Sequence, residues 1–142
     1  MSNIVKFFVA TRAGALGVMN SGVDASFRTA SFGNFDVEEA LLDWEAHLTG
    51  QSFESLVGQG LPLAVADDEA GSAVFLLSDE LLAQLLAASS SQIDELAGWW
   101  VQEKAANGVE IDRSIALIIL QELVDLIRQE RGTDEGVYCW TT

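Results

Sequence analysis

The strongest hydrophobic pattern in the chain is a run of six apolar residues at positions 115–120. Apolar residues continue at helical spacing through Ile127, so the pattern predicts a helix over about 112–131. Asp112 is placed to cap its N-terminus, and Arg131 followed by Gly132 is typical of a C-terminus. Because two turns lack a polar face, we expect this helix to be buried on most sides. The run is far shorter than the roughly 20 apolar residues of a membrane span.

Stretches rich in β-branched and aromatic residues predict several short strands. The predicted strands are residues 3–10, 26–30, 61–66, 73–77 and 137–141. The acidic turn between the third and fourth of these predicts a hairpin, and we expect the first and last strands to pair. Residues 11–22 are compatible with a short helix, which Gly14 and Gly17 would each weaken by about 1 kcal/mol.

The middle of the chain carries helical periodicity with clear start signals. Asp36 with Glu39 resembles a capping box, and Gly50 marks the end of that helix. Its apolar stripe predicts an opposite polar face that carries Asp43 and Glu45. Further helices are predicted over residues 52–57, from Ser78, and from Ser91 onward. In the last of these Lys104 falls on the apolar stripe, where we expect its stem to lie along apolar surface.

These elements predict an α+β fold in a single domain over residues 1–142. Terminal strands and a central hairpin are expected to form a small mixed sheet, packed with four to five helices around a buried C-terminal helix. Neither an internal repeat nor a linker divides the chain. A domain of this length can bury roughly 70% of its unfolded surface, which suffices for a core without disulfides or metal.

The charge is strongly unbalanced, with 22 acidic residues against seven lysines and arginines and a formal net charge of −15. Direct binding to nucleic acid or to an anionic membrane surface is disfavoured, because like charges repel. Attraction to a basic or mixed protein partner is one interpretation of this charge, and solubility alone is the other. Cys139 is the lone cysteine, so an intramolecular disulfide is excluded. The apolar run near Phe7 is too short for a secretory signal, and we expect a cytoplasmic protein.

The order of elements resembles the YfbM-like family of small bacterial domains of unknown function, over roughly residues 36–142. The resemblance rests on a Trp-containing helix that ends in Leu48-Thr49-Gly50, on a strand that leads into Leu77-Ser78-Asp79-Glu80, and on the turn at Gly108-Val109. A long apolar helix and an aromatic terminal strand follow, as in the family. Trp44 and His47 lie closer to the Leu-Thr-Gly end than in family members. The family has no established activity, so the resemblance implies an architecture and transfers no catalytic residue.

Candidate chemistry centres on His47, the single histidine. Asp43 lies four residues before it and is a possible ion-pair partner on one helix face. A Cys–His dyad would require Cys139 to lie beside His47. One histidine and one cysteine cannot build a structural zinc site, and glycine-rich nucleotide loops are absent, so neither metal nor cofactor is predicted. Trp99 points away from the inward face of its helix, so it is a candidate interface anchor or else is covered by a neighbouring element.

Two classes of function remain open. The first is a non-catalytic protein-interaction domain, of which an immunity-like role or nucleic-acid mimicry would be special cases. The second is a small-molecule binder or enzyme with a pocket near His47, lined by Trp44 and Cys139. We favour the interaction domain because the sequence contains no complete catalytic constellation, and we take Trp44, His47 and Trp99 as candidate binding residues.

Overall fold

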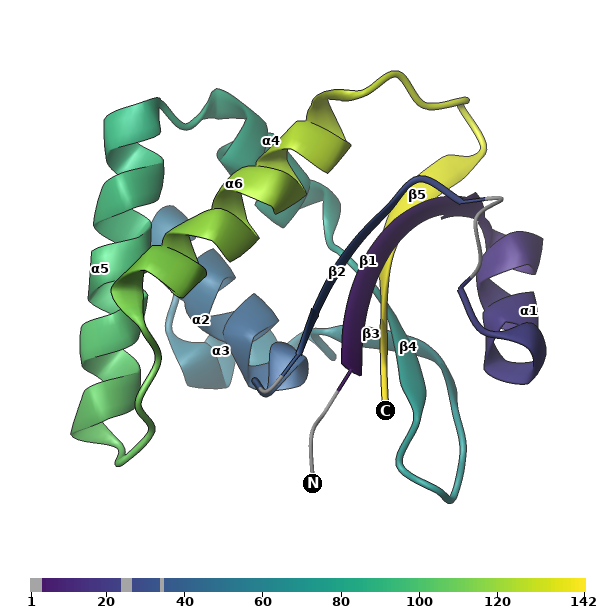
Figure 1. Cartoon of the computed structure of the whole chain (residues 1–142), viewed down its shortest axis with the longest axis horizontal. Coiled ribbons are helices and arrows are strands. Elements are labelled where there is room, and N and C mark those ends of the chain that lie inside the picture. The colour runs from purple at the N-terminus through teal and green to yellow at the C-terminus, as the bar shows by residue number, and fades with distance from the viewer. Residues whose placement is uncertain (1–3, 24–26, 34) are drawn as a thin grey trace.

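The computed structural model describes residues 4–23, 27–33 and 35–142. Figure 1 shows these residues as one antiparallel sheet with helices on both of its faces. The elements in chain order are β1 (Ile4–Thr11), α1 (Arg12–Ser21), β2 (Thr29–Gly33), α2 (Val37–Thr49), α3 (Phe53–Gly58), β3 (Leu63–Asp67), β4 (Ala73–Leu76), α4 (Asp79–Ala87), α5 (Ser90–Ala106), α6 (Arg113–Arg128) and β5 (Glu135–Thr141).

The five strands are arranged in the order β2-β1-β5-β4-β3. All four neighbouring pairs are antiparallel, and the central pair joins β1 to β5 in the register Phe7–Cys139. Successive side chains of a strand point to opposite faces of a sheet. Accordingly Phe7 and Cys139 face one layer of helices, whereas Phe8 and Tyr138 face the other side.

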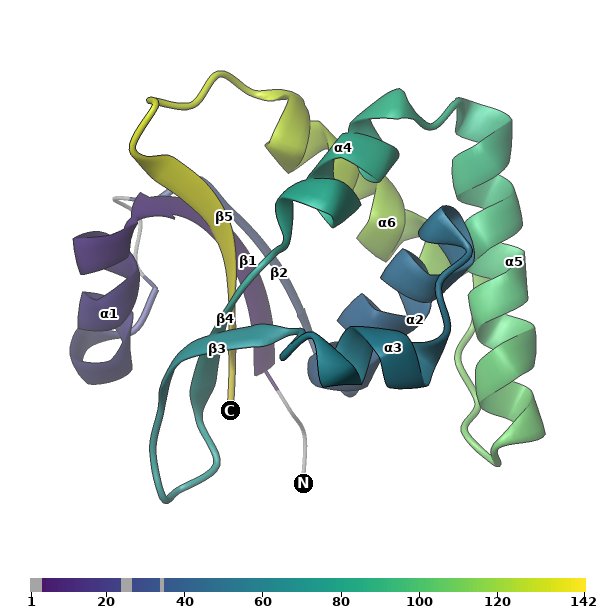
Figure 2. The same ribbon diagram turned by 180° about the vertical axis from the view of Figure 1, so that it is seen from behind.

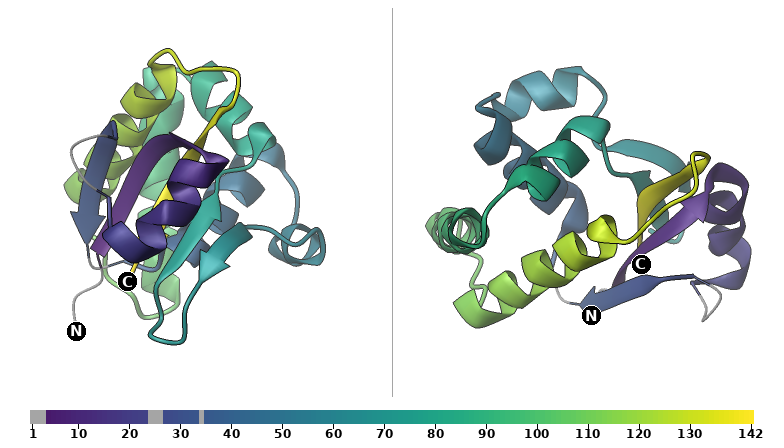
Figure 3. Two further views of the ribbon diagram at one scale, coloured as in Figure 1. Left: turned by 90° about the vertical axis from the view of Figure 1, so that its right-hand side faces the viewer. Right: turned by 90° about the horizontal axis from the view of Figure 1, so that it is seen from above.

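The two faces of the sheet are covered unequally. Helix α1 packs alone on one face, and helices α2, α4, α5 and α6 form a thick layer on the other (Figure 1). Figure 3 shows the same layers from the side and from above, with α1 separated from the larger helical layer by the strands. Because the central strands carry apolar residues on both faces, each layer of helices has a hydrophobic surface to cover.

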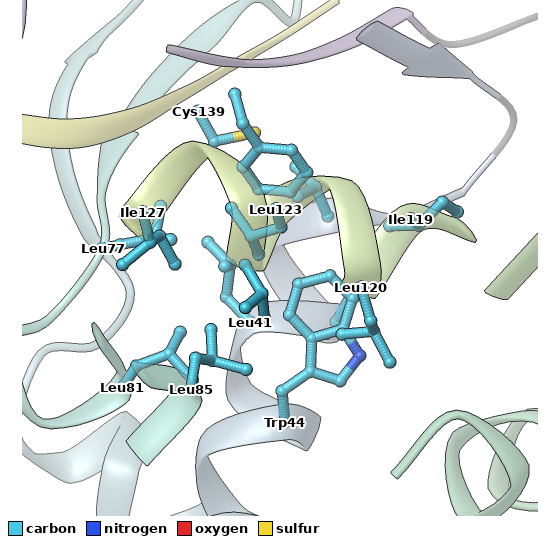
Figure 4. Close-up of a cluster of buried hydrophobic side chains, with 14 of the residues drawn as sticks. Leu41, Trp44, Leu77, Leu81, Leu85, Ile119, Leu120, Leu123, Ile127 and Cys139 are labelled. Carbon is cyan, nitrogen blue, oxygen red and sulfur yellow. The ribbon is translucent and has the colours of Figure 1, made fainter. Parts of the chain in front are cut away.

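The main core lies between the sheet and the four-helix layer. Helix α6 supplies Leu120 and Leu123, which are fully buried among residues from α2, α4 and the sheet (Figure 4). Trp44 of α2 is also fully buried, and its ring meets Trp100 of α5 edge to face with centroids 5.0 Å apart. Such edge-to-face aromatic pairs add stability beyond their buried area and fix how two helices pack.

The predicted α+β fold is confirmed, and the first and last strands do pair. The sheet is antiparallel in every described pair, not mixed, because the hydrophobic pattern of a strand does not encode its direction. Residues 12–21 form a helix, and the strand expected near 26–30 lies at 29–33; residues 24–26 fall outside the described part of the chain. The expectation that α6 is buried on most sides is wrong. Ile115 and Ile118 are about half exposed, because no described element covers the outer face of this helix.

The ends of the helices follow local start and stop signals. The carboxylates of Asp36 and Asp112 accept hydrogen bonds from the first backbone N–H groups of α2 and α6, and Ser78 caps α4 in the same way. Gly50 ends α2 in the left-handed conformation that glycine adopts without strain. Helix α5 begins earlier than the predicted start at Ser91, because Ser89 is its N-cap and forms a capping box with Gln92.

Candidate functional site

His47 and Trp99 come together where α2 crosses α5. The imidazole of His47 stacks on the Trp99 ring with centroids 4.2 Å apart and an angle of 19° between the planes. Its Nε2 atom lies 2.9 Å from Oε2 of Glu95. Glu95 is one helical turn before Trp99, so α5 presents a carboxylate and an aromatic ring side by side to the histidine.

A shallow hollow of about 250 Å³ adjoins the histidine. Figure 2 shows from behind the three helices that supply its lining, α2, α4 and α5. The lining residues are His47, Leu48, Gln84, Ala87, Ala88, Gln92 and Glu95. The hollow therefore offers an imidazole, a carboxylate and two amides, but its lining contains no serine, threonine or cysteine that would serve as a nucleophile.

The Asp43–His47 pair expected from the sequence does not form. Asp43 is only 7% exposed, and its Oδ2 atom lies 2.7 Å from Nζ of Lys104 on α5. Glu39 on the next turn of α2 also pairs with Lys104. The ammonium of Lys104 is buried between the two helices. Lys104 therefore forms ion pairs in addition to the predicted packing of its aliphatic stem on apolar surface.

The pKa values of Asp43 and Lys104 are both raised in this cluster. Burial raises the pKa of Asp43, and the attraction of Lys104 offsets this only in part. Burial works against the charge on Lys104, but its bonds to Asp43 and Glu39 outweigh burial and raise its pKa. One cation is thus shared by two carboxylates, and the cluster holds α2 against α5 as a structural contact.

A second buried carboxylate, Glu45, also departs from its predicted place on an outer polar face of α2. Its Oε1 atom accepts a hydrogen bond of 2.6 Å from the hydroxyl of Ser78, the residue that caps α4. Helix α2 is covered on both sides by other elements, so Asp43 and Glu45 point to individual partners and not to solvent. These partners lie far away along the chain, where helical periodicity carries no information.

Trp44 and Cys139 do not line the hollow beside His47. Trp44 is fully buried in the core and packs on Phe7 and Trp100. Cys139 is fully buried on the sheet face beneath α6, and burial raises the pKa of its thiol well above the ordinary value. Both residues therefore belong to the core, and only His47 and Trp99 of the candidate residues come together.

Glu95 belongs to this site but was not among the residues predicted from the sequence. Glu95 lies four residues before Trp99, and this spacing indicates that the two side chains share one face of the helix. Over residues 4–23, 27–33 and 35–142, no group of three or more His, Cys, Asp or Glu side chains is placed to hold a metal ion. Within the same part of the chain, no helix has the length and apolar character needed to cross a bilayer.

Comparison of the chain with protein-family models, curated proteins and solved structures finds no match. The resemblance to the YfbM-like family stays a prediction.

Proposed function

We propose that this protein is a non-catalytic interaction domain that binds a basic protein partner. The observation that carries the proposal is the uneven distribution of charge along the fold. Residues 36–128, named here the acidic segment, contain 18 acidic and three basic residues. The rest of the chain contains four of each and is neutral. The acidic segment comprises α2 to α6 and the β3–β4 hairpin, so the charge belongs to the larger helical layer and its hairpin.

The few basic residues of the acidic segment do little to offset its charge. Lys104 is buried and paired with two carboxylates, and Arg113 lies 3.3 Å from Asp94. Arg128 is the third, and Asp125 lies one helical turn before it. A surface charged in one sense attracts an oppositely charged partner over long range, and the attraction weakens as salt increases. The same field repels the phosphate backbone of nucleic acids.

A cytoplasmic location is part of the proposal. Cys139 is the lone cysteine and is buried as a thiol, an arrangement compatible with a reducing compartment. The expected partner is a protein with a basic surface in that compartment. No step of this proposal requires a cofactor or metal.

The proposal is tested by capture of partners from lysate of the source organism at low salt and at about 0.5 M salt, where attraction between surface charges is screened. Two variants that each lose four negative charges are compared, one within the acidic segment and one outside it as the control. One replaces Glu38, Glu80, Glu103 and Glu122 of the acidic segment by Gln. The other replaces Asp24 and Asp134 by Asn, and Glu130 and Glu135 by Gln.

A specific protein that is captured at low salt, released at high salt and lost only with the first variant supports the proposal. Absence of a captured protein at both salt concentrations refutes it. Equal capture by both variants refutes it as well, because the charge would then serve solubility alone.

Small-molecule binding is a second candidate, favoured by the stacked His47 and Trp99 beside the hollow of about 250 Å³. A fragment screen followed by amide chemical shifts tests this alternative. Shifts at His47, Gln84 and Gln92 that vanish in His47→Ala would support it. A screen without shifts at these residues would eliminate it.

A further inference from the structure

Two isoleucines are exposed next to each other on α6. Ile115 and Ile118 are 54% and 49% exposed, although the opposite side of the helix is buried in the core. Residues three apart on a helix are neighbours, so the two side chains form one apolar surface. An exposed apolar surface rimmed by polar residues is a candidate contact surface for a partner, although one made by two side chains is small. We name the outer face of α6 from Ser114 to Asp125 the α6 face.

Acidic residues surround these isoleucines. Glu122 lies one turn after Ile118 on the same face, and Asp125 lies a further turn along. Glu110 and Asp112 precede the helix and are also exposed. Arg113 and Arg128 are also exposed at the two ends of this helix, and the four acidic residues outnumber them. The α6 face therefore combines a small apolar centre with a net negative surround.

A groove of about 240 Å³ runs beside the α6 face, between α6 and the start of α5. Its lining includes Ile93 and Val124 together with Gln121 and Asp125, and the last two lie on the α6 face. Figure 1 shows α6 at the front of the helical layer, and the view from above in Figure 3 places it at the outer edge of the molecule. No other described element lies across it.

We propose that the α6 face is the docking site of the interaction domain, and that its occupant is a basic amphipathic helix of the partner protein. This inference rests on the proposed function and specifies the surface and the kind of partner. A helix with lysine or arginine on one side and aliphatic residues on the other matches this face in both charge and polarity. Its apolar residues would cover Ile115 and Ile118 and fill the groove, as in other complexes in which a helix occupies a groove.

Charge argues against a second copy of this chain as the occupant, because two molecules of net charge −15 repel each other. Addition of a partner strand to β3 is less favoured, although Phe53, Val57 and Leu63 are exposed near that edge. β3 is five residues long, and its register shifts between Ala64 and Ala66. Short and bulged edge strands are poor templates for pairing.

The test uses a synthetic peptide of about four helical turns with leucine at i, i+3, i+4 and i+7 and lysine elsewhere. A scrambled peptide of identical composition controls for charge alone. Binding is followed by amide chemical shifts and by fluorescence anisotropy at about 0.15 M salt. The variant Ile115→Gln/Ile118→Gln removes the apolar centre, and Leu16→Gln on α1 is the control because Leu16 is similarly exposed on the opposite side of the sheet.

Shifts confined to residues 114–125 and to the groove are expected with the amphipathic peptide. The double glutamine variant should weaken its binding at least tenfold, about 1.4 kcal/mol, and Leu16→Gln should leave Kd unchanged. Both variants should melt like wild type, because the substituted side chains are half exposed.

Shifts centred on α3 and β3, or equal affinity for the scrambled peptide, would overturn the inference. Self-association of the free protein in sedimentation would overturn it too. Partner capture from lysate distinguishes failure of the docking site from failure of the proposed function. If the double glutamine variant still captures the partner, the function stands and the docking site is wrong, whereas capture of no protein by wild type means that the function itself fails.

Discussion

Removal of the Lys104 charge should destabilise the protein in a manner that depends on pH. Lys104→Met replaces the ammonium by an apolar group of similar length. Asp43, only 7% exposed, then loses the cation that lies 2.7 Å from it in the wild type. Glu39 and Glu103 raise the pKa of Asp43 further, so the carboxylate is left among like charges.

The expected cost is about 3 kcal/mol of unfolding free energy at pH 7. Breaking a buried ion pair by removal of one partner costs roughly 3–5 kcal/mol. The lower end of this range applies because only Asp43 is left buried without its cation. The side chain of Glu39 is 45% exposed and remains hydrated. Asp43→Asn should cost less, about 1 kcal/mol, since Lys104 keeps Glu39 as its partner. In the double variant the two losses should not add, because the buried charge that caused the larger loss is gone.

The dependence on pH follows from the raised pKa of Asp43. A carboxyl with a folded pKa above its unfolded value contributes stability that is present below the unfolded value and lost as pH rises through the folded one. Lys104→Met raises the folded pKa of Asp43 further, since the attraction of Lys104 lowers it in the wild type. The deficit of the variant should therefore shrink as the pH falls toward about 4, the ordinary pKa of an aspartate, because a growing fraction of Asp43 is then protonated.

Urea unfolding followed by the fluorescence of the buried Trp44 and Trp100 measures these differences between pH 4 and pH 8. If Lys104→Met costs less than about 1 kcal/mol at pH 7, the level of an exposed ion pair, Lys104 and Asp43 do not form a buried pair. A deficit that stays constant with pH would also refute the buried pair, because loss of packing alone does not titrate.

Two further predictions concern α6 and the sheet. Leu123→Ala should lower the unfolding free energy by about 3 kcal/mol because it leaves a cavity in the core, whereas Ile118→Ala on the exposed side should cost less than about 1 kcal/mol; similar losses in urea unfolding would contradict the placement of α6. The Cys139 thiol should not react with an aromatic disulfide reagent in the native protein and should react fully in denaturant, since it is entirely buried with a raised pKa. Rapid reaction in native buffer would show that the thiol is accessible.

The parts of the fold that follow local rules could be predicted from the sequence. Both ends of α2 and the start of α6 were predicted from Asp36, Gly50 and Asp112, because caps act within a few residues of the helix end. The C-terminal end of α6 was expected at Arg131 and lies at Arg128. Strand positions followed from β-branched and aromatic runs. The strands were placed to within about three residues, the ordinary uncertainty of element boundaries.

The exposure of one side of α6 could not be predicted from such local rules. Its six consecutive apolar residues predict burial all round, but only one side of the helix meets the core. An exposed isoleucine and a buried one look identical in a hydrophobic pattern. The distinction depends on which other elements cover the helix, and that is a property of the assembled layer.

Only some residues of the candidate site were predicted, and their arrangement was not. His47 and Trp99 were both selected, yet their stacking depends on where α2 crosses α5. Glu95 pairs with His47 across 48 residues, and Glu39 pairs with Lys104 across 65. The expected Asp43–His47 pair obeyed helical spacing and was wrong, because Asp43 pairs with the buried Lys104 and His47 pairs with Glu95.

The central pairing of β1 with β5 has a consequence for how the chain folds as it is synthesised. Phe7 pairs with Cys139, so the middle of the sheet cannot form until almost all of the described chain has emerged from the ribosome. Before that moment the nascent chain holds only the β1–β2 and β3–β4 pairs, and two-stranded units are marginally stable in water. Contacts between such distant residues also slow folding. The domain should therefore fold late and in one cooperative step, and deletion of β5 should yield a chain that is degraded and does not persist as a smaller domain.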